Sequence, residues 1–198
     1  MGEITLDRTS RILVIGTSGS GKTTLAEKLS ARLGIKNIEL DALFWKENWT
    51  QSTTEEFRGN ISDSIKDSIK EARGYVLHGN YNKVQDLTWG NVDTVIWLDY
   101  SRAIVMCRVV KRTIGRILSK EELWAGNRET FKKSFLKKDS IILWAWNTYG
   151  KRKTQYSMMV KENPYKVSKF IIMKRPKDAN RFLKGIELAI EEKGRGRS

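Results

Sequence analysis

The sequence predicts an α/β fold of three layers, in which about five parallel strands lie between helices. Three observations predict it. Short apolar runs alternate with longer segments whose apolar residues recur every three or four positions, the order expected of a parallel sheet joined by right-handed helical crossovers. The first run, residues 11–15, leads directly into a glycine, as a buried parallel strand often does. The chain of 198 residues suits one domain, residues 1–198.

The expected elements follow one another along the chain. Strands are expected at residues 11–15, 38–40, 75–77, 94–98 and 170–173. Helices are expected at residues 22–33, 52–72, 101–118, from about 128 to beyond 146, and 176–193. The capping-box pattern from Ser52 to Glu55 opens the second of these helices, in which Phe57, Ile61, Ile65 and Ile69 recur every four positions.

The charge of the chain favours anionic partners. Its 37 basic and 23 acidic residues give a formal charge of +14, which suits nucleotides, nucleic acid or anionic lipid without choosing among them. No stretch reaches the roughly 18 apolar residues of a membrane span, so no membrane partner is expected. Residues 1–10 lack an apolar signal core, and the single cysteine, Cys107, cannot form an internal disulfide. A cytoplasmic location is therefore expected.

Residues 16–23 read G-T-S-G-S-G-K-T and match the phosphate-binding loop pattern G-x-x-x-x-G-K-[ST]. A predicted strand precedes the loop and a predicted helix follows it, so the backbone N–H groups and the helix N-terminus should cradle the phosphates of ATP. Lys22 should reach the β- and γ-phosphates, and Thr23 should place its hydroxyl on Mg²⁺. The expected nucleotide-binding residues are Gly16, Thr17, Ser18, Gly19, Ser20, Gly21, Lys22, Thr23 and Thr24.

Polar and aromatic residues follow the second strand, at the edge where such sheets bind ligands. Asp41 is expected to end that strand, where its carboxylate would accept a proton from a substrate hydroxyl or hold Mg²⁺ through water. A helix cap or a turn is the structural alternative. Phe44 and Trp45, with Trp49 close behind, would wall a pocket for the phosphoryl acceptor, or else pack in the core.

The third and fourth strands end in further candidates. Gly79 should allow close backbone approach to a ligand, and Asn80 and Tyr81 should hydrogen-bond the acceptor. His78, the single histidine, is more simply structural than catalytic. Asp99 is a candidate for the water shell of the metal, although a helix cap is the favoured interpretation.

Basic residues are dense after Asp99. Eleven lie between residues 102 and 138, and Arg108, Arg112 and Arg116 share one helix face. A basic, lid-like helical segment at about residues 112–130 would close over the phosphates, where its cations would neutralise developing charge. Arg112, Arg116 and Arg128 are the candidates, and a solvated basic face is the alternative.

The ordered motifs resemble the bacterial topology modulation protein group, a branch of the adenylate-kinase-like P-loop kinases. The matching segments run from residue 12 to about 146 and read GTSGSGKTT, LDALFWKENW, YVLHGNY, DTVIWLDYSR, RVVKRTIGR and ILWAWN. The resemblance implies strand order 2-3-1-4-5, an ATP site and an arginine-bearing lid. It also implies that Arg175 and Pro176 lie beside the adenine, and that an aspartate of the metal-water shell is replaced here by His78.

The leading hypothesis is an Mg²⁺- and ATP-dependent kinase of a small acceptor such as a nucleoside or nucleotide. The absence of an N-K-x-D motif favours ATP over GTP. A nucleic-acid-associated NTPase or regulator that uses the basic surface is the alternative. The histidine at position 78 supports a third hypothesis, a nucleotide-binding protein with little catalysis.

Overall fold

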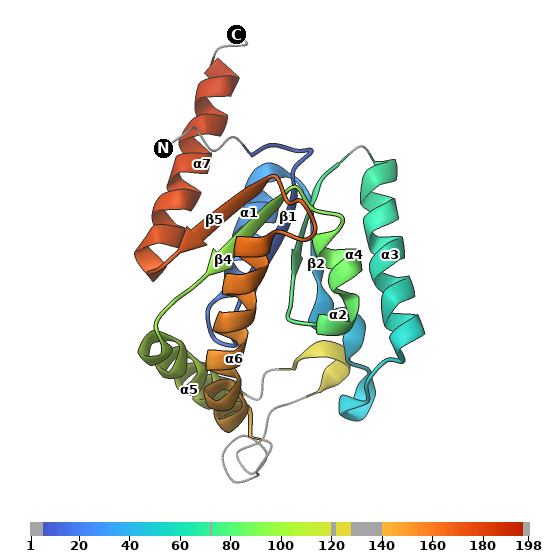
Figure 1. Ribbon diagram of the computed structural model, residues 1–198, viewed down its shortest axis with the longest axis vertical. Coiled ribbons are helices and arrows are strands. Elements are labelled where there is room, and N and C mark those ends of the chain that lie inside the picture. The colour runs from blue at the N-terminus through green and yellow to red at the C-terminus, as the bar shows by residue number, and fades with distance from the viewer. Residues whose placement is uncertain (1–5, 72, 120–121, 128–139, 196–198) are drawn as a thin grey trace.

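The computed structural model describes residues 6–71, 73–119, 122–127 and 140–195. Its centre is a five-stranded parallel sheet in the order β2-β3-β1-β4-β5 (Figure 1), which confirms the expected order and fold class. The strands are β1 (Arg11–Gly16), β2 (Lys36–Glu39), β3 (Tyr75–His78), β4 (Thr94–Leu98) and β5 (Lys169–Met173).

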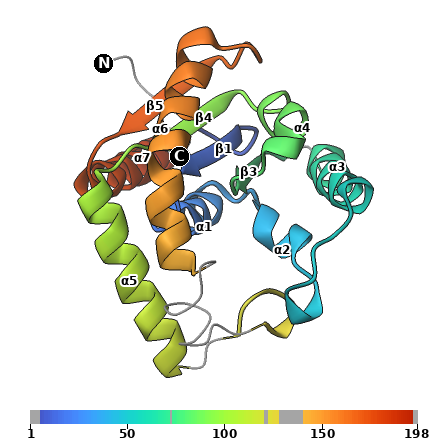
Figure 2. The same ribbon diagram turned by 60° about the horizontal axis from the view of Figure 1, so that its bottom comes forward.

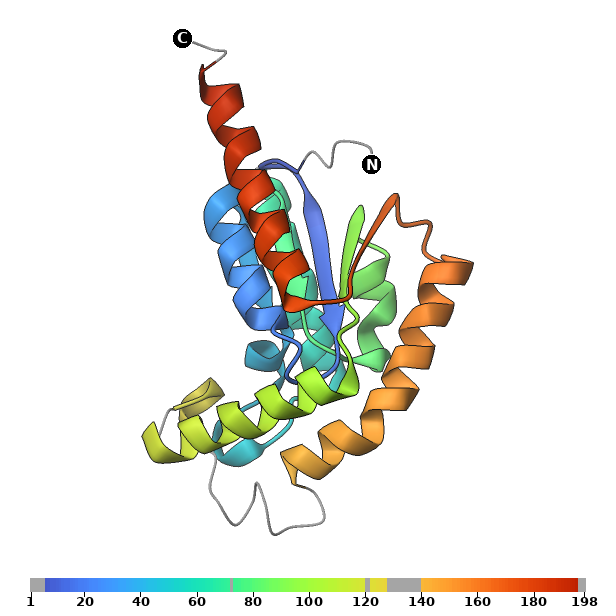
Figure 3. The same cartoon turned by 90° about the vertical axis from the view of Figure 1, so that its left-hand side faces the viewer.

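Helices cover both faces of the sheet, because the central strands carry apolar side chains on both faces. Ile12 and Val14 of β1 pack in one core with α1 (Lys22–Leu33) and α7 (Pro176–Arg195). Leu13 and Ile15 point the other way, into a second core. Figure 3 shows α1 and α7 on one side of the sheet and α4 and α6 on the other. The second layer comprises α3 (Thr54–Lys70), α4 (Gln85–Trp89) and α6 (Ile141–Glu162).

Short elements gather at the edge of the sheet where the parallel strands end. Figure 2 looks onto this edge, with α5 on one side of α1 and α2 on the other. The elements beyond the strand ends are α5 (Arg102–Ser119), α2 (Leu40–Phe44) and the 3₁₀ turns η1 (Glu47–Trp49), η2 (Asn82–Val84) and η3 (Trp124–Gly126). Ligands of open α/β sheets bind at this edge.

The second strand is shorter at its C-terminal end than the sequence predicts. It ends at Glu39, and Asp41 lies in the first turn of α2 rather than at a strand end. The apolar pattern could not mark this boundary, because Leu40 is buried in α2 as it would be in a strand.

The capping box of α3 lies one residue later than predicted. The Thr53 hydroxyl accepts a hydrogen bond from the Glu56 backbone N–H, and the Glu56 carboxylate accepts one from the Thr53 N–H. Ser52 is instead tied to the preceding segment, since its hydroxyl donates to the Leu43 carbonyl. In this helix Phe57, Ile61 and Ile65 are buried while Ile69 is 55% exposed. A four-residue spacing advances about 40° per step around a helix of 3.6 residues per turn, so the stripe drifts out of the core.

The helix predicted from about residue 128 is α6, which is described from Ile141 and is capped by the Ser140 hydroxyl. Residues 128–139 lie outside the described part of the chain. None of the described helices is long and apolar enough to cross a bilayer.

Candidate functional site

The phosphate-loop motif forms a tight turn between β1 and α1 that only glycine permits at two positions. A Cβ on Gly16 would lie 2.6 Å from the Ser20 hydroxyl oxygen, and one on Gly19 would lie 2.4 Å from a Val109 methyl carbon. Gly19 also has φ +80°, a left-handed conformation. The turn therefore rests directly on α5, and its shape depends on this close approach.

Lys22 turns back over this loop. Its ammonium donates to the Thr17 carbonyl at 3.1 Å. Burial lowers the pKa of Lys22 to about 8, partly offset by the negative charge of Asp41. The Ser20 hydroxyl is buried and has no hydrogen-bond partner among the described residues. A desolvated cation and an unpaired hydroxyl in one loop suit a phosphate, which carries negative charge and several acceptor oxygens.

Two neighbouring helices hold the loop in place. From α5, Arg108 donates to the Ser20 carbonyl at 3.1 Å. In the segment that follows β3, the Asn80 side-chain amide donates to the Gly16 carbonyl at 2.8 Å. Residues of α6 in turn hold Asn80, since the Tyr156 hydroxyl and the Arg152 guanidinium donate to its side-chain and backbone oxygens.

A cavity of about 1490 Å³ extends from the loop in two directions. The loop and the first turn of α1 form its middle, with α7 on one side and α2 on the other (Figure 2). The α7 side is mainly apolar and is lined by Tyr100, Trp144, Pro176, Ala179 and Leu183. Such a lining suits a planar base, which leaves the α2 side for an acceptor.

Asp41 and Tyr81 lie together on the α2 side. The Tyr81 hydroxyl donates to the Asp41 carboxylate at 2.5 Å and accepts a hydrogen bond from the Trp45 side chain. Burial and the charge of Asp41 raise the pKa of Tyr81, so the hydroxyl stays protonated and remains a donor. Asp41 is thereby oriented by a fixed donor while it still lines the cavity.

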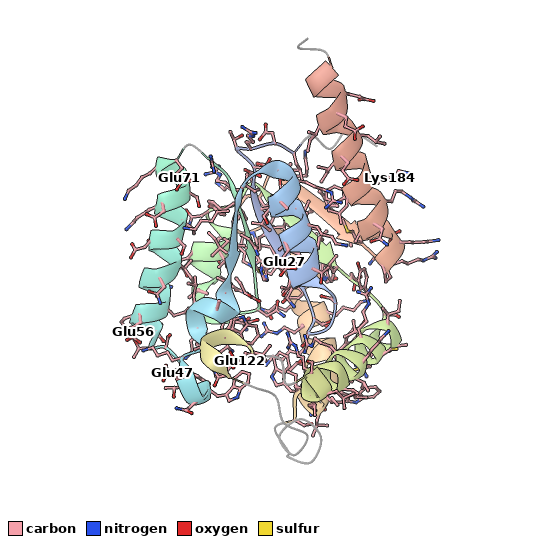
Figure 4. All side chains as sticks on the ribbon, turned by 180° about the vertical axis from the view of Figure 1, so that it is seen from behind. Glu27, Glu47, Glu56, Glu71, Glu122 and Lys184 are labelled. Atoms are coloured by element: carbon pink, nitrogen blue, oxygen red, sulfur yellow. The ribbon has the colours of Figure 1, made fainter. Side chains whose placement is uncertain are left out.

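Three tryptophans wall the acceptor side. The Trp45 and Trp49 ring centroids are 5.5 Å apart, and those of Trp49 and Trp124 are 6.4 Å apart. The Trp124 side chain hydrogen-bonds the Glu39 carboxyl, whose pKa is raised by burial despite this contact. Figure 4 shows Glu122 at the start of the segment that carries η3, beside α2. Glu39 and Glu122 both line the cavity.

Asn127 joins the two segments that carry Trp49 and Trp124. Its side-chain oxygen accepts from the Trp49 N–H at 2.7 Å, and its amide donates to the Lys46 and Trp124 carbonyls at 2.8 Å each. Asn127 is only 5% exposed. Each polar atom of its side chain thus has a partner, and η1 and η3 are held together over the acceptor side.

Two of the three candidate lid arginines line the cavity. The charge of Arg112 contributes to the lowered pKa of Lys22. The charge of Arg116 acts against the rise in the pKa of the Glu39 carboxyl. Both arginines line the cavity. The two arginines therefore face the phosphate loop and the acceptor side respectively. Arg128 lies outside the described residues.

The structure places three other predicted residues away from the cavity lining. Phe44 packs between Phe57 and Tyr81 behind the tryptophan wall. Arg175 donates its backbone N–H to Asp178, and it is the following residues of α7 that line the cavity. An added Cβ on Gly79 would lie 2.6 Å from the Leu40 Cβ, so the close approach it allows is to α2.

The Asp99 carboxylate forms ion pairs with two lysines rather than a cap on the following helix. One carboxylate oxygen lies 3.0 Å from the Lys153 ammonium, and the other accepts from Lys174. This ion-pair cluster joins β4 to α6 and to the segment after β5. The Ser101 hydroxyl lies at the start of α5, where the sequence favoured Asp99 as the cap.

His78 is 1% exposed, and its Nε2 atom has no hydrogen-bond partner among the residues described. Burial and then the nearby charge of Lys22 lower its pKa to about 4, so the ring is neutral at pH 7.

The described residues fit a magnesium ion that is held mainly by substrate. They contain no group of three or more histidine, cysteine or acidic side chains arranged to bind a metal. Mg²⁺ retains several waters and is often bound through one or two protein oxygens together with nucleotide phosphates. Thr23, exposed in the first turn of α1, would supply one such oxygen.

Sequence reasoning missed several residues of the site. Arg108 belongs to the predicted basic helix face but is not among the predicted site residues, because its contact with the loop comes from the packing of α5 on Gly19. Trp124 lies 75 positions after Trp49, which the sequence does place with the aromatic wall, so only the fold brings the two rings together. Glu39 lies in β2, as the sequence predicts, but the sequence did not predict that it lines the cavity.

The fold and the loop geometry define a P-loop, nucleotide-binding, kinase-like protein. Residues 12–130 match the family model described as an AAA domain, so the chain belongs to this P-loop NTPase-like family. The finer resemblance to the topology modulation group stays a prediction. Among curated proteins, none matches this chain.

Many solved structures share the fold. One is an unliganded sugar kinase from Janibacter sp. HTCC2649, with 17% sequence identity and a TM-score of 0.51. The match covers 91% of this chain and 96% of that one. At this level of identity the likeness shows a shared fold.

Proposed function

We propose that the chain transfers the γ-phosphoryl group of ATP to a hydroxyl of a small acceptor. The observation that carries the proposal is the single cavity that joins the phosphate loop to a lining of Asp41, Tyr81 and tryptophans. A nucleoside or nucleotide is the acceptor that the sequence suggests, and the sugar kinase of similar fold adds sugars to the compounds worth testing.

In the proposed reaction, loop amides and Lys22 bind the phosphates and Thr23 binds Mg²⁺. Asp41 accepts the proton of the attacking hydroxyl, with Tyr81 holding the carboxylate in place. Arg112 and Arg116 neutralise charge that develops on the transferred group. Bound Mg²⁺ would supply further neutralisation of the phosphate oxygens.

Replacing Lys22 by alanine tests the phosphate-binding role. We expect the variant to lose at least about 100-fold in ATP turnover, because it removes a cation aimed at the phosphates. Turnover is measured as ADP release with a panel of sugars, nucleosides and nucleotides. Lys66→Ala is the control, since Lys66 is an exposed residue of α3 whose side chain is 64% accessible. Equal turnover in the Lys22→Ala variant and the control would refute the proposal.

A further inference from the structure

The acceptor side of the cavity carries negative charge that would repel an anionic acceptor. Glu39 and Asp41 lie close enough for each charge to act on the other, and Glu122 and Arg116 line the same space. Among the described residues of this side, three carboxylates therefore outnumber the one guanidinium. A phosphate-bearing acceptor has only acceptor oxygens and negative charge to offer these carboxylates. Like charges in a partly desolvated site cost free energy.

The desolvated Glu39 carboxyl favours a hydrogen-bond donor. Burial raises its pKa, and the contact from the Trp124 side chain opposes that shift only in part. A carboxylate in such a place is stabilised by every further donor that replaces water. Hydroxyl groups are uncharged donors of this kind.

The tryptophans on the acceptor side suit the apolar surface of an acceptor that also carries hydroxyls. Trp45, Trp49 and Trp124 form a half-buried wall. Indole rings bury apolar C–H surface well, and the Trp45 and Trp124 side chains already hydrogen-bond Tyr81 and Glu39. The C–H groups of a sugar ring or a sugar-like chain would pack against these rings, and its hydroxyls would face the carboxylates.

A cationic acceptor fits this site poorly. Lys22, Arg108 and Arg112 line the cavity at the phosphate loop, where the reacting group must lie. An ammonium group beside them would be repelled, just as a phosphate would be repelled by the carboxylates. An uncharged molecule avoids both costs.

Resting on the phosphotransferase function above, we propose that the acceptor is an uncharged polyhydroxyl compound, a sugar, polyol or nucleoside, rather than a nucleotide or a sugar phosphate. The acceptor hydroxyl oxygen forms a bond to the γ-phosphorus of ATP, and the bond from that phosphorus to the β,γ-bridging oxygen breaks. ADP leaves with the bond electrons, and the hydroxyl proton passes to Asp41.

The test compares matched neutral and phosphorylated compounds. The pairs are glucose and glucose 6-phosphate, ribose and ribose 5-phosphate, and uridine and UMP, titrated calorimetrically into protein saturated with a non-hydrolysable ATP analogue and Mg²⁺. We expect at least one neutral member to bind at least about tenfold more tightly than its phosphorylated partner, a difference of about 1.4 kcal/mol. Tighter binding of the phosphorylated members would overturn the proposal, as would no binding by any neutral member.

The variant Glu39→Gln tests whether the carboxylates cause the selection. It keeps the side-chain length and removes one negative charge, so we expect the affinity ratio within each pair to shrink several-fold. Glu55→Gln, on the exposed first turn of α3, is the matched control and should leave the ratio unchanged. An unchanged ratio in Glu39→Gln would contradict the charge argument.

Binding of the ATP analogue separates the two proposals. If the analogue binds but the acceptor pairs behave contrary to expectation, only the acceptor class fails. If the analogue does not bind, or binds equally well to Lys22→Ala, the phosphotransferase function itself fails.

Discussion

At the scale of single residues, His78 gives the chain a pH-dependent stability. Burial and the charge of Lys22 lower its pKa from 6.5 to about 4. The unfolded chain therefore binds more protons than the folded chain between these values. The stability that neutral His78 contributes is present above pH 6.5 and is lost as the pH falls toward 4.

His78→Leu removes this titration. We expect the free energy of unfolding of the unmodified protein to fall more steeply with acidification than that of the variant, by up to about 1.4 kcal/mol per pH unit. Urea denaturation at several values between pH 7 and 4 measures both slopes. Parallel slopes would contradict the prediction, whatever the absolute stability of the variant.

Asp41 is the residue on which the proposed chemistry depends most. Asp41→Asn keeps the shape and an oxygen for the Tyr81 hydroxyl but cannot accept a proton. We expect kcat to fall by about 10²- to 10⁴-fold while affinity for the ATP analogue changes little. Asp63→Asn, at an exposed position of α3, is the control. A small loss of kcat would mean that Asp41 positions the acceptor without taking its proton.

At the scale of elements, Asn127 is the connection between η1 and η3. Three hydrogen bonds converge on its side chain, and both connected segments contain residues with positive φ, Asn48, Trp49 and Ala125. Such conformations persist only where surrounding contacts hold them. The acceptor wall therefore depends on one buried amide.

Asn127→Ala should release this connection. We expect loss of protection at the Trp49 amide in hydrogen exchange, and a loss of about 1–3 kcal/mol in the free energy of unfolding, because buried groups lose their partners. Asn60→Ala, exposed on α3, should show neither effect. Retained protection at Trp49 would show that the tryptophan packing alone holds the wall.

The elements also show where sequence reasoning succeeds. The strands and the phosphate loop were predictable because their signals are local: apolar runs, and glycines next to Lys22. The turn of the chain into α2 was not predictable, since Leu40 packs against Gly79, which follows another strand. The roles of Asn127 and Trp124 could not be predicted either, because each needs a partner that is remote in sequence.

At the scale of the whole molecule, the positive charge is distributed over more than the cavity. Lys177, Arg181 and Lys184 are exposed at three- and four-residue spacing on α7, while Ala179 and Leu183 of the same helix line the cavity. Figure 4 shows Lys184 on the side of α7 that points away from the body of the molecule. The outer face of α7 is thus a basic surface separate from the nucleotide site.

This separation makes the nucleic-acid alternative testable without disturbing the proposed kinase site. If the basic surface binds nucleic acid, a gel shift with duplex DNA should appear at low salt and weaken steeply as salt is added, because phosphate contacts release counterions. The triple variant Lys177→Glu, Arg181→Glu, Lys184→Glu should then lose the shift while ADP release is retained. The matched control reverses three exposed lysines outside α7, Lys66 and Lys70 of α3 and Lys83 of η2. No shift at low salt would remove this alternative, and an equal loss in both triple variants would assign the binding to overall charge rather than to α7.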